Sequence, residues 1–506
     1  MTIGVVIGES RPTDVTAQSS KPLSVGEYVI IDSQDGQILG LVEKSIISSE
    51  ALTDVRNFDE AVESKEVADI NSRDKNYKVK IGILGFLDKL QKGQMILPAV
   101  PPLPGTSILE ATQKDLGVIF GPITEEWVRI GSLLRNSSIE AKINVNKIVS
   151  RHLAILAMTG MGKSNLVSLI ARHVASLNGT LIIFDYHNDY ENLDVAKMNY
   201  MLAKINPRLL PADKLAEVIE LRENADKQQR ALRESFTESV KQSKDFWQAL
   251  EESAASFGRT TKGYADSASR VLDKIDDAKH RFSDILDPDC GDPVDLIKEG
   301  RVNVLNISEL SERQANAGLA YYLQELLQHR KDAVWERKGK SSGKRSNKFL
   351  APIFVIIEEA HVFIPKGEHT DTKYWASKVA REGRKFGIGL GIVSQRPRNI
   401  DPNVLSQMGS LAIMKIVQDD DQQQIASAAE SLSKDLLSQL SSLNIGDAVL
   451  IGQWVNLPSI VHVDEVKSKK SGSDLNAVSE WNQTDKFKEV AKESTKSMIQ
   501  KDLLLD

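Results

Sequence analysis

The sequence predicts an α/β protein: a parallel sheet with helices around it, a small β-barrel before it and a helical insertion within it. Three observations predict this class. Short strands and turns fill the first 135 residues, apolar strands that end in polar residues recur after residue 150, and a charged helical stretch separates two groups of these strands. Strands that are apolar throughout are typical of parallel sheets buried on both faces.

The composition is that of a globular protein with more than one domain. The chain has 506 residues, 41% of them apolar and 26% charged, and its net charge is −6. Such a chain would bind nucleic acid only through a local basic surface, such as the wall of a channel. Its single cysteine, Cys290, excludes an intrachain disulfide. Without a recognisable signal peptide or membrane span, we expect a cytoplasmic protein.

Residues 1–135 are expected to form the barrel. Asp35 and Gly36 are a strong hairpin signal between two of its strands. The expected strands lie at 4–7, 28–31, 38–42, 79–84 and 128–131. Short strands at this spacing are typical of small barrels. No catalytic group is evident among them, so we interpret this domain as one for assembly or partner docking.

The segment 136–195 contains a P-loop, Ala-Met-Thr-Gly-Met-Gly-Lys-Ser at 157–164, between an apolar strand at 153–156 and an apolar helix. Gly160 and Gly162 let the backbone curl around a phosphate, and the helix N-terminus adds positive potential. Lys163 is a point charge for the β- and γ-phosphates, and the Ser164 hydroxyl can ligate magnesium. Ala157 replaces the usual first glycine, which is a mild departure.

Asp185 ends the next buried strand, at 181–185, and polar residues follow it. The carboxyl ends of parallel strands are where such sheets bind ligands. A helix cap or a turn is an equally good interpretation of this aspartate.

The segment 196–300 is expected to be a helical insertion between two strands of the sheet, and its mixed charges indicate a solvated surface. The segment 301–465 then returns to the sheet, with strands at 302–307, 353–357, 388–393, 411–416, 448–451 and 460–463.

Two adjacent carboxylates, Glu358 and Glu359, follow the apolar strand at 353–357. Carboxylates at the end of a buried strand usually have a function there. In a P-loop ATPase one acid holds the metal shell and the next polarises the attacking water. We assign Glu358 to the metal and Glu359 to the water.

Gln395 follows the strand at 388–393 and can sense the γ-phosphate and orient water. Arg381 and Arg384 lie three residues apart, on one face of a helix. Such an arginine can reach the γ-phosphate of a neighbouring subunit, although a surface arginine is the ordinary interpretation of either one alone.

Two further segments are less informative. A basic glycine-serine stretch at 338–348 could contact nucleic acid, but a solvated connector is the better interpretation. Residues 466–506 are expected to form a linker and a polar helical tail.

Together these motifs resemble those of the HerA proteins, in the HerA/FtsK group of ring ATPases. The matching stretches are the P-loop, Asp-Tyr-His at 185–187, Ile-Ile-Glu-Glu-Ala-His at 356–361, Ala-Arg-Glu-Gly-Arg-Lys-Phe-Gly at 380–387 and Ser-Gln-Arg-Pro at 394–397. The resemblance spans nearly the whole chain and implies a RecA-like P-loop ATPase core with a HAS-barrel-like N-terminal domain. One departure is Asn188-Asp189, where relatives tend to carry Gly-Glu.

The resemblance implies an ATP- and Mg²⁺-dependent homo-hexameric ring that translocates on double-stranded DNA. It implies action with the NurA nuclease in DNA end resection and double-strand break repair, alongside Mre11 and Rad50. It implies Glu359 as catalytic base, Gln395 as sensor, Arg384 as arginine finger, and Ser164 and Glu358 as metal ligands. The implied ATP-binding residues are Arg151, Gly160, Met161, Gly162, Lys163, Ser164, Asn165, His462 and Val463.

Two other functions remain open on the sequence. One is a conjugation- or secretion-type ring ATPase that moves another polymer. The other is an ATP-dependent DNA clamp or scaffold for a nuclease, against which the pair Glu358-Glu359 argues, because a clamp needs binding more than hydrolysis.

Overall fold

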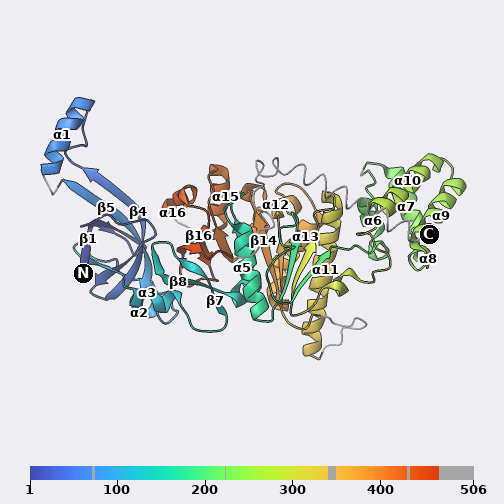
Figure 1. Ribbon diagram of the computed structural model, residues 1–506, viewed down its shortest axis with the longest axis horizontal. Helices are drawn as coiled ribbons and strands as arrows, with labels where there is room; N and C mark the ends of the chain where they lie inside the picture. The colour runs from blue at the N-terminus through green and yellow to red at the C-terminus, as the bar shows by residue number, and fades with distance from the viewer. Residues whose placement is uncertain (71–73, 223, 340–348, 430–433, 467–506) are drawn as a thin grey trace, which may run out of the picture.

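The computed structural model describes residues 1–70, 74–222, 224–339, 349–429 and 434–466. The molecule is elongated, with the barrel at one end, the large sheet in the middle and the helical insertion at the other end (Figure 1). The expected C-terminal tail and most of the basic stretch at 338–348 lie outside the described residues.

The N-terminal barrel is closed and six-stranded, in the order β1-β2-β5-β4-β3-β6. Its strands are β1 Thr2–Ser10, β2 Asp14–Ser19, β3 Tyr28–Ser33, β4 Gly36–Ser49, β5 Lys75–Phe86 and β6 Ser107–Glu110. The expected hairpin is confirmed, because Ser33 pairs with Gly36 across the turn. Helix α1 Phe58–Ile70 joins β4 to β5 and projects away from the barrel (Figure 1). Helix α2 Leu87–Leu90 packs against β4 and β5, and α3 Gln113–Phe120 packs against residues 136–144 of the central sheet.

The central sheet has eleven described strands, in the order β11-β12-β10-β13-β14-β9-β15-β16-β17-β7-β8. The pairs from β11 to β15 are parallel and the remaining pairs are antiparallel. The strands are β7 Trp127–Leu133, β8 Asn136–Asn144, β9 Leu153–Leu156, β10 Thr180–Asp185, β11 Met198–Leu202, β12 Val302–Asn306, β13 Ile353–Ile357, β14 Ile388–Ser394, β15 Ser410–Ile413, β16 Asp447–Gly452 and β17 Ser459–Val463.

One strand was expected in the wrong sheet. The strand at 128–131 exists as part of β7, but it pairs with β17 and β8 and not with the barrel. A Cβ atom on Gly131 would lie 2.0 Å from the carbonyl oxygen of His462, so the absence of a side chain there permits this close pairing. The strand β11 was not expected from the sequence, because it is a half-buried edge strand without a clear alternation of apolar residues.

The helices surround this sheet. The expected helical insertion lies between β11 and β12, so the segment 196–300 assigned to it also contains the strand β11. The insertion comprises α6 Ala212–Val218, α7 Asp226–Ser235, α8 Glu238–Lys241, α9 Phe246–Thr260 and α10 Ala265–Arg281. The other helices are α4 Val145–Arg151, α5 Lys163–Ser176, α11 Glu312–Arg337, α12 Ala360–Phe363, α13 Asp371–Phe386, α14 Pro402–Leu405, α15 Asp419–Ala428 and α16 Lys434–Gln439. Within the described residues, no helix combines the length and apolar character that crossing a membrane requires.

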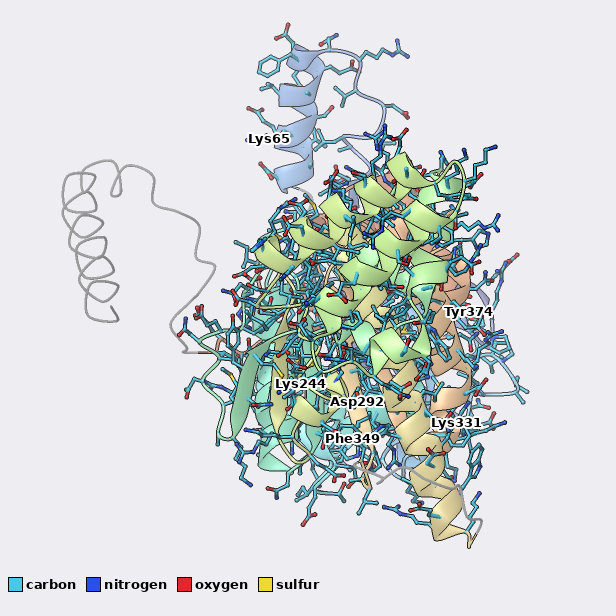
Figure 2. All side chains as sticks on the ribbon, turned by 90° about the vertical axis from the view of Figure 1, so that its right-hand side faces the viewer. Lys65, Lys244, Asp292, Lys331, Phe349 and Tyr374 are labelled. Carbon is cyan, nitrogen blue, oxygen red and sulfur yellow. The ribbon has the colours of Figure 1, made fainter. Side chains whose placement is uncertain are left out.

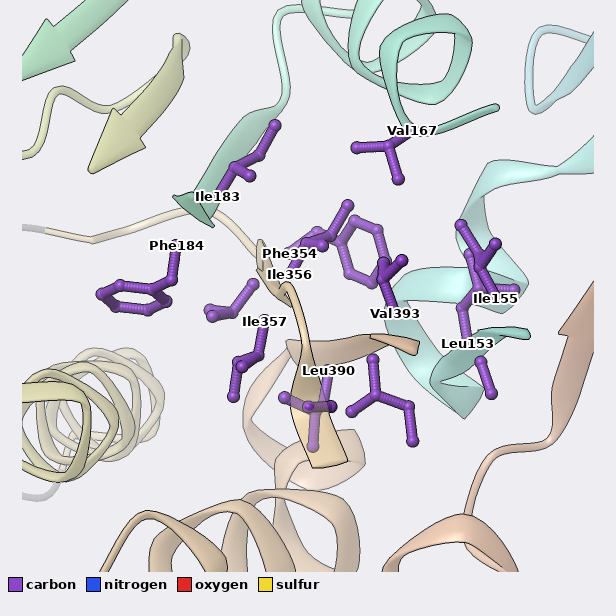
Figure 3. Close-up of a cluster of buried hydrophobic side chains, with 14 of the residues drawn as sticks. Leu153, Ile155, Val167, Ile183, Phe184, Phe354, Ile356, Ile357, Leu390 and Val393 are labelled. Atoms are coloured by element: carbon purple, nitrogen blue, oxygen red, sulfur yellow. The ribbon is translucent and has the colours of Figure 1, made fainter. Parts of the chain in front are cut away.

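Buried aliphatic and aromatic side chains hold the centre of the sheet together. Figure 3 shows side chains of β9, β10, β13 and β14 packed with Val167 of α5. Ile183, Phe184 and Ile357 are fully buried. Burying such a side chain stabilises the fold by about 1.5–3 kcal/mol. This core gives rigid support to the loops that leave the carboxyl ends of the strands.

Candidate functional site

The P-loop connects the carboxyl end of β9 to the start of α5. Gly160 and Gly162 have φ angles of 77° and 106°, in the left-handed region that favours glycine. Gly162 is the N-cap residue of α5 and has no side chain to occupy the first backbone N–H groups of the helix. Those N–H groups can therefore bind an anion, helped by the helix dipole.

Lys163 and Ser164 begin α5 and face acidic groups. The Lys163 ammonium donates to the carbonyl oxygens of Ala157 and Met158, both at 3.2 Å. Burial lowers the Lys163 pKa, and nearby carboxylates, chiefly Glu359, oppose that change. The Ser164 hydroxyl donates to a carboxylate oxygen of Asp189 at 3.2 Å. A cation and a hydroxyl thus stand where a phosphate and its metal would bind.

Glu358 lies directly after β13 and is almost fully buried. Burial raises its pKa to about 8, and Asp185 and Asp189 add to the rise, while a hydrogen bond from Tyr190 opposes it. The Tyr190 hydroxyl donates to Glu358 Oε1. Glu358 therefore belongs to a buried acidic cluster, and one of its oxygens already has a protein partner.

Glu359 has a different environment from its neighbour. Its φ angle is 44°, and a non-glycine residue in this region costs about 1–3 kcal/mol, a strain typical of functional sites. His361 Nδ1 lies 3.1 Å from Glu359 Oε2, and His187 Nε2 lies 3.4 Å from Oε1. Burial alone would raise the Glu359 pKa, but His361, Lys163 and His187 outweigh it and lower the pKa. Glu359 is thus suited to act as an ionised base at neutral pH.

Gln395 follows β14 and lies against the P-loop. The Thr159 hydroxyl donates to the Gln395 side-chain oxygen. Ser394, one residue earlier, has its hydroxyl 3.2 Å from His361 Nδ1. His361 therefore stands between the base and the strand of the sensor. The motif at 356–361 contains His361 but does not by itself indicate this role. The available signal in the sequence is its position two residues after the expected base.

A cavity of about 370 Å³ lies beside the P-loop. Its lining includes Thr159 and Gln395 together with two arginines, Arg396 and Arg398. Apolar side chains, such as Met158 and Ile416, and the carboxylate residue Asp421 also line this cavity, which lies next to the expected sensor.

The segment after β17 lies on the first turn of α5. The Asn165 amide donates to the carbonyl oxygen of Asp464 at 3.0 Å and accepts from the Val466 N–H at 2.8 Å. Val463 N–H bonds to Gly446, whose own N–H bonds to Met161 of the P-loop. The end of β17, with His462 and Val463, is thus linked to the P-loop through Gly446, and the adenine contact of these two residues stays a prediction.

Arg151 and Arg384 lie at the opposite edge of the sheet. Arg151 ends α4 immediately before β9, and Arg384 lies in the last turn of α13, before the amino end of β14. His152 joins the two helices through a 2.9 Å hydrogen bond to the carbonyl of Ala380. The P-loop leaves the other end of β9, so one chain does not bring these arginines to its own P-loop.

A second group of possible metal ligands lies near this amino edge. Asp292, Glu325 and His329 each place one oxygen or nitrogen within 4.8 Å of the others, and Asp292 is labelled in Figure 2. Glu325 and His329 are buried on α11. This group is remote from the P-loop, so a metal that accompanies a nucleotide would need the ligands around Ser164.

The fold and these contacts define a class. A phosphate-binding loop at the carboxyl edge of a parallel sheet, with an ionised glutamate held beside its lysine, is the arrangement of a P-loop ATPase. The relatives of this chain lie within that class.

Residues 128–326 match the family "Helicase HerA, central domain", and residues 3–88 match the HAS barrel domain. The chain is 36% identical to the DNA double-strand break repair helicase HerA of Saccharolobus solfataricus, covering 97% of this chain and 98% of that protein. It is 38% identical to the Sulfolobus acidocaldarius protein of that name, covering 95% and 97%. The chain therefore belongs to the HerA family, as its motifs predicted, and is a P-loop ATPase.

Among solved structures, VirB4 of Thermoanaerobacter pseudethanolicus has a TM-score of 0.48 and 13% identity, covering 69% of this chain and 98% of VirB4. This likeness is too weak to bear on function.

Proposed function

We propose that this ATPase is a motor that translocates on double-stranded DNA as a homo-hexameric ring. The observation that carries the hydrolytic part is the contact of Glu359 with His361 and His187, since this arrangement keeps a base ionised beside the P-loop lysine. The DNA part is supported by family membership, because the relatives described above carry the name of a DNA double-strand break repair helicase.

Different residues of one chain would bind the phosphates of ATP and its metal ion. The P-loop N–H groups and Lys163 would hold the β- and γ-phosphates, while Ser164 and a nearby carboxylate, which the sequence predicts to be Glu358, would hold Mg²⁺. The donor set fits this ion, because hydroxyl and carboxylate oxygens are the ligands that magnesium takes. When bound, Mg²⁺ would neutralise charge on the β- and γ-phosphate oxygens.

Hydrolysis itself would depend on the residues next to the P-loop. Glu359 would polarise the attacking water, and His361 would hold the Glu359 carboxylate in place and in its ionised form. Gln395 would exchange its contact with Thr159 for the γ-phosphate or the water. The segment after β17, anchored by Asn165, would cover the adenine.

The ring is proposed because the arginines lie at the wrong edge to act within one chain. Arg384 is exposed in the last turn of α13, and Arg151 lies nearby at the end of α4. In a closed ring, the amino edge of one subunit would face the P-loop of the next, so these arginines would act on the neighbour's nucleotide.

The proposed partners rest on the family resemblance, and the proposed compartment rests on the sequence. We propose that the protein acts in the cytoplasm with the NurA nuclease in DNA end resection, alongside Mre11 and Rad50. The barrel would serve assembly or docking. Phosphate contacts without base readout would suffice for movement along DNA.

The first test is steady-state ATP hydrolysis with and without linear double-stranded DNA, with Glu359→Gln as the inactive control. Strong stimulation by DNA is expected of a DNA motor. A high basal rate of ATP hydrolysis that DNA does not change, even after the nuclease is added, would contradict the motor. It would favour a ring ATPase that moves another polymer. DNA binding that needs ATP but not its hydrolysis would favour the clamp.

A further inference from the structure

We propose that Asp189 is a further magnesium-shell residue, whose carboxylate joins the Ser164 hydroxyl in holding the metal that accompanies the nucleotide. This inference rests on the proposed binding of Mg²⁺ and ATP at the P-loop and adds a residue that the motifs do not indicate.

The contact between Ser164 and Asp189 carries the proposal. Ser164 Oγ and Asp189 Oδ2 are 3.2 Å apart. Magnesium binds oxygen ligands at 2.0–2.1 Å in octahedral geometry, so neighbouring ligands lie about 3 Å apart. The two oxygens therefore already have the spacing of adjacent ligands on one ion. Their hydrogen bond would give way to the metal without movement of the backbone.

The turn that presents Asp189 is held firmly. Asp185 is fully buried and accepts the backbone N–H groups of Asp189 and Tyr190 at 3.0 and 2.9 Å. Asn188 takes a left-handed conformation, with φ of 61°, and its side chain accepts from the Tyr200 hydroxyl at 2.7 Å. This use of Asp185 agrees with the turn-forming interpretation left open by the sequence. When such contacts already orient a ligand residue, less free energy is lost in ordering it as the metal binds.

Glu358 is more deeply buried than Asp189, so its carboxylate is less accessible to an ion. One of its oxygens accepts the Tyr190 hydroxyl, and only 4% of the residue is exposed. Asp189 is half-buried, and its carboxylate touches the first turn of α5. We therefore expect Glu358 to act from behind the metal shell, as a positioning residue, while Asp189 meets the ion or one of its waters.

The test is nucleotide binding by calorimetry, with the full-length protein and a non-hydrolysable ATP analogue, in EDTA and in excess Mg²⁺. The unchanged protein should bind more tightly with Mg²⁺. Asp189→Asn should lose most of this gain, about 10-fold or more in Kd, while its affinity in EDTA stays the same. The affinity in EDTA also reports that the P-loop is folded.

Two variants serve as controls. Asp194→Asn removes one carboxylate from the same loop, where Asp194 pairs with Arg172 at 2.9 Å, and should keep the full gain from Mg²⁺. Glu358→Gln should lose less of that gain than Asp189→Asn. Binding of Mn²⁺, followed by its electron paramagnetic resonance in the presence of the nucleotide analogue, should rank the variants in the same order.

Three results separate the inference from the proposed function. Full Mg²⁺ enhancement in Asp189→Asn, or a larger loss in Glu358→Gln, would overturn the role of Asp189 and leave the motor intact. Normal metal-dependent binding without stimulation of ATPase by DNA would overturn the motor and leave Asp189 in place. No nucleotide binding by the unchanged protein would overturn both.

Discussion

The two edges of the central sheet differ in how many groups of the expected ATPase site they bring together. At the carboxyl edge, polar groups from five segments contact one another: the P-loop, the turn after β10, the carboxylates after β13, Gln395 after β14 and the segment after β17. At the amino edge, Arg151 and Arg384 lie close to each other through α4 and α13 but away from this cluster. One chain thus presents most of a hydrolytic site at one edge and a set of cations at the other.

The difference shows which residues a parallel sheet can bring together within one chain and which it keeps apart. Parallel strands bring loops that are distant in sequence to one edge, because all their carboxyl ends lie there. They also move the residues that precede each strand to the far edge. A site that needs both sets must draw the second one from another chain, and this is the reason for proposing a ring.

The largest effect is expected at the carboxyl edge. Glu359→Gln removes the base and should lower the turnover of ATP by at least about 10²-fold, while nucleotide binding remains. Single-turnover hydrolysis and analogue binding would be measured together. Turnover close to that of the unchanged protein would remove Glu359 from the catalytic role.

The amino edge provides the next test. Arg384→Ala should also reduce turnover by about 10²-fold or more, because an arginine finger stabilises the transition state. Arg381→Ala, one turn earlier on α13, is the matched control and should have a smaller effect.

Mixing two inactive variants distinguishes an arginine finger that acts on a neighbouring subunit from one that acts within its own chain. Rings assembled from Arg384→Ala and Lys163→Ala subunits should recover part of the activity, because some interfaces then combine an intact P-loop with an intact arginine. If no mixture recovers any hydrolysis, the action across subunits loses its support.

A smaller effect is expected at His361. His361→Asn removes the group that most lowers the pKa of Glu359 and should reduce turnover by about 10-fold. A base works only when ionised, so activity falls as pH drops through its pKa. Because the variant has a higher Glu359 pKa, its activity should begin to fall at a higher pH. If the activity of the variant and that of the unchanged protein fall at the same acidic pH, His361 does not act through Glu359.

The smallest effect is expected at Asn165. Asn165→Ala removes two hydrogen bonds to the segment after β17, each worth about 0.5–1.5 kcal/mol. Nucleotide affinity should fall by about 3- to 10-fold with little change in the rate of hydrolysis of bound ATP. Ser176→Ala, at the far end of α5, is the matched control and should change neither. If Asn165→Ala and the unchanged protein bind the nucleotide equally well, the segment after β17 does not contribute to nucleotide binding.

Most of the fold was readable from local patterns. The glycines of the P-loop, the buried strand before Glu358 and the hairpin at Gly36 each depend on residues close together in the chain. The errors concern partners that are distant in sequence. The strand β7 pairs with β17, more than three hundred residues later, and β11 is defined by its neighbour β12 and not by its own composition.

The sequence by itself determined the class of the site, because a phosphate requires glycines, a lysine and a helix start within eight consecutive residues. It also determined the family, and it predicts which glutamate acts as the base. The tertiary structure decided which side chains meet: His361 with Glu359, Tyr190 with Glu358, and Asp189 with Ser164. It also decided that both arginines lie at the far edge. The reason is physical: motif chemistry is local, whereas burial, charge and distance between segments arise only when the strands are side by side.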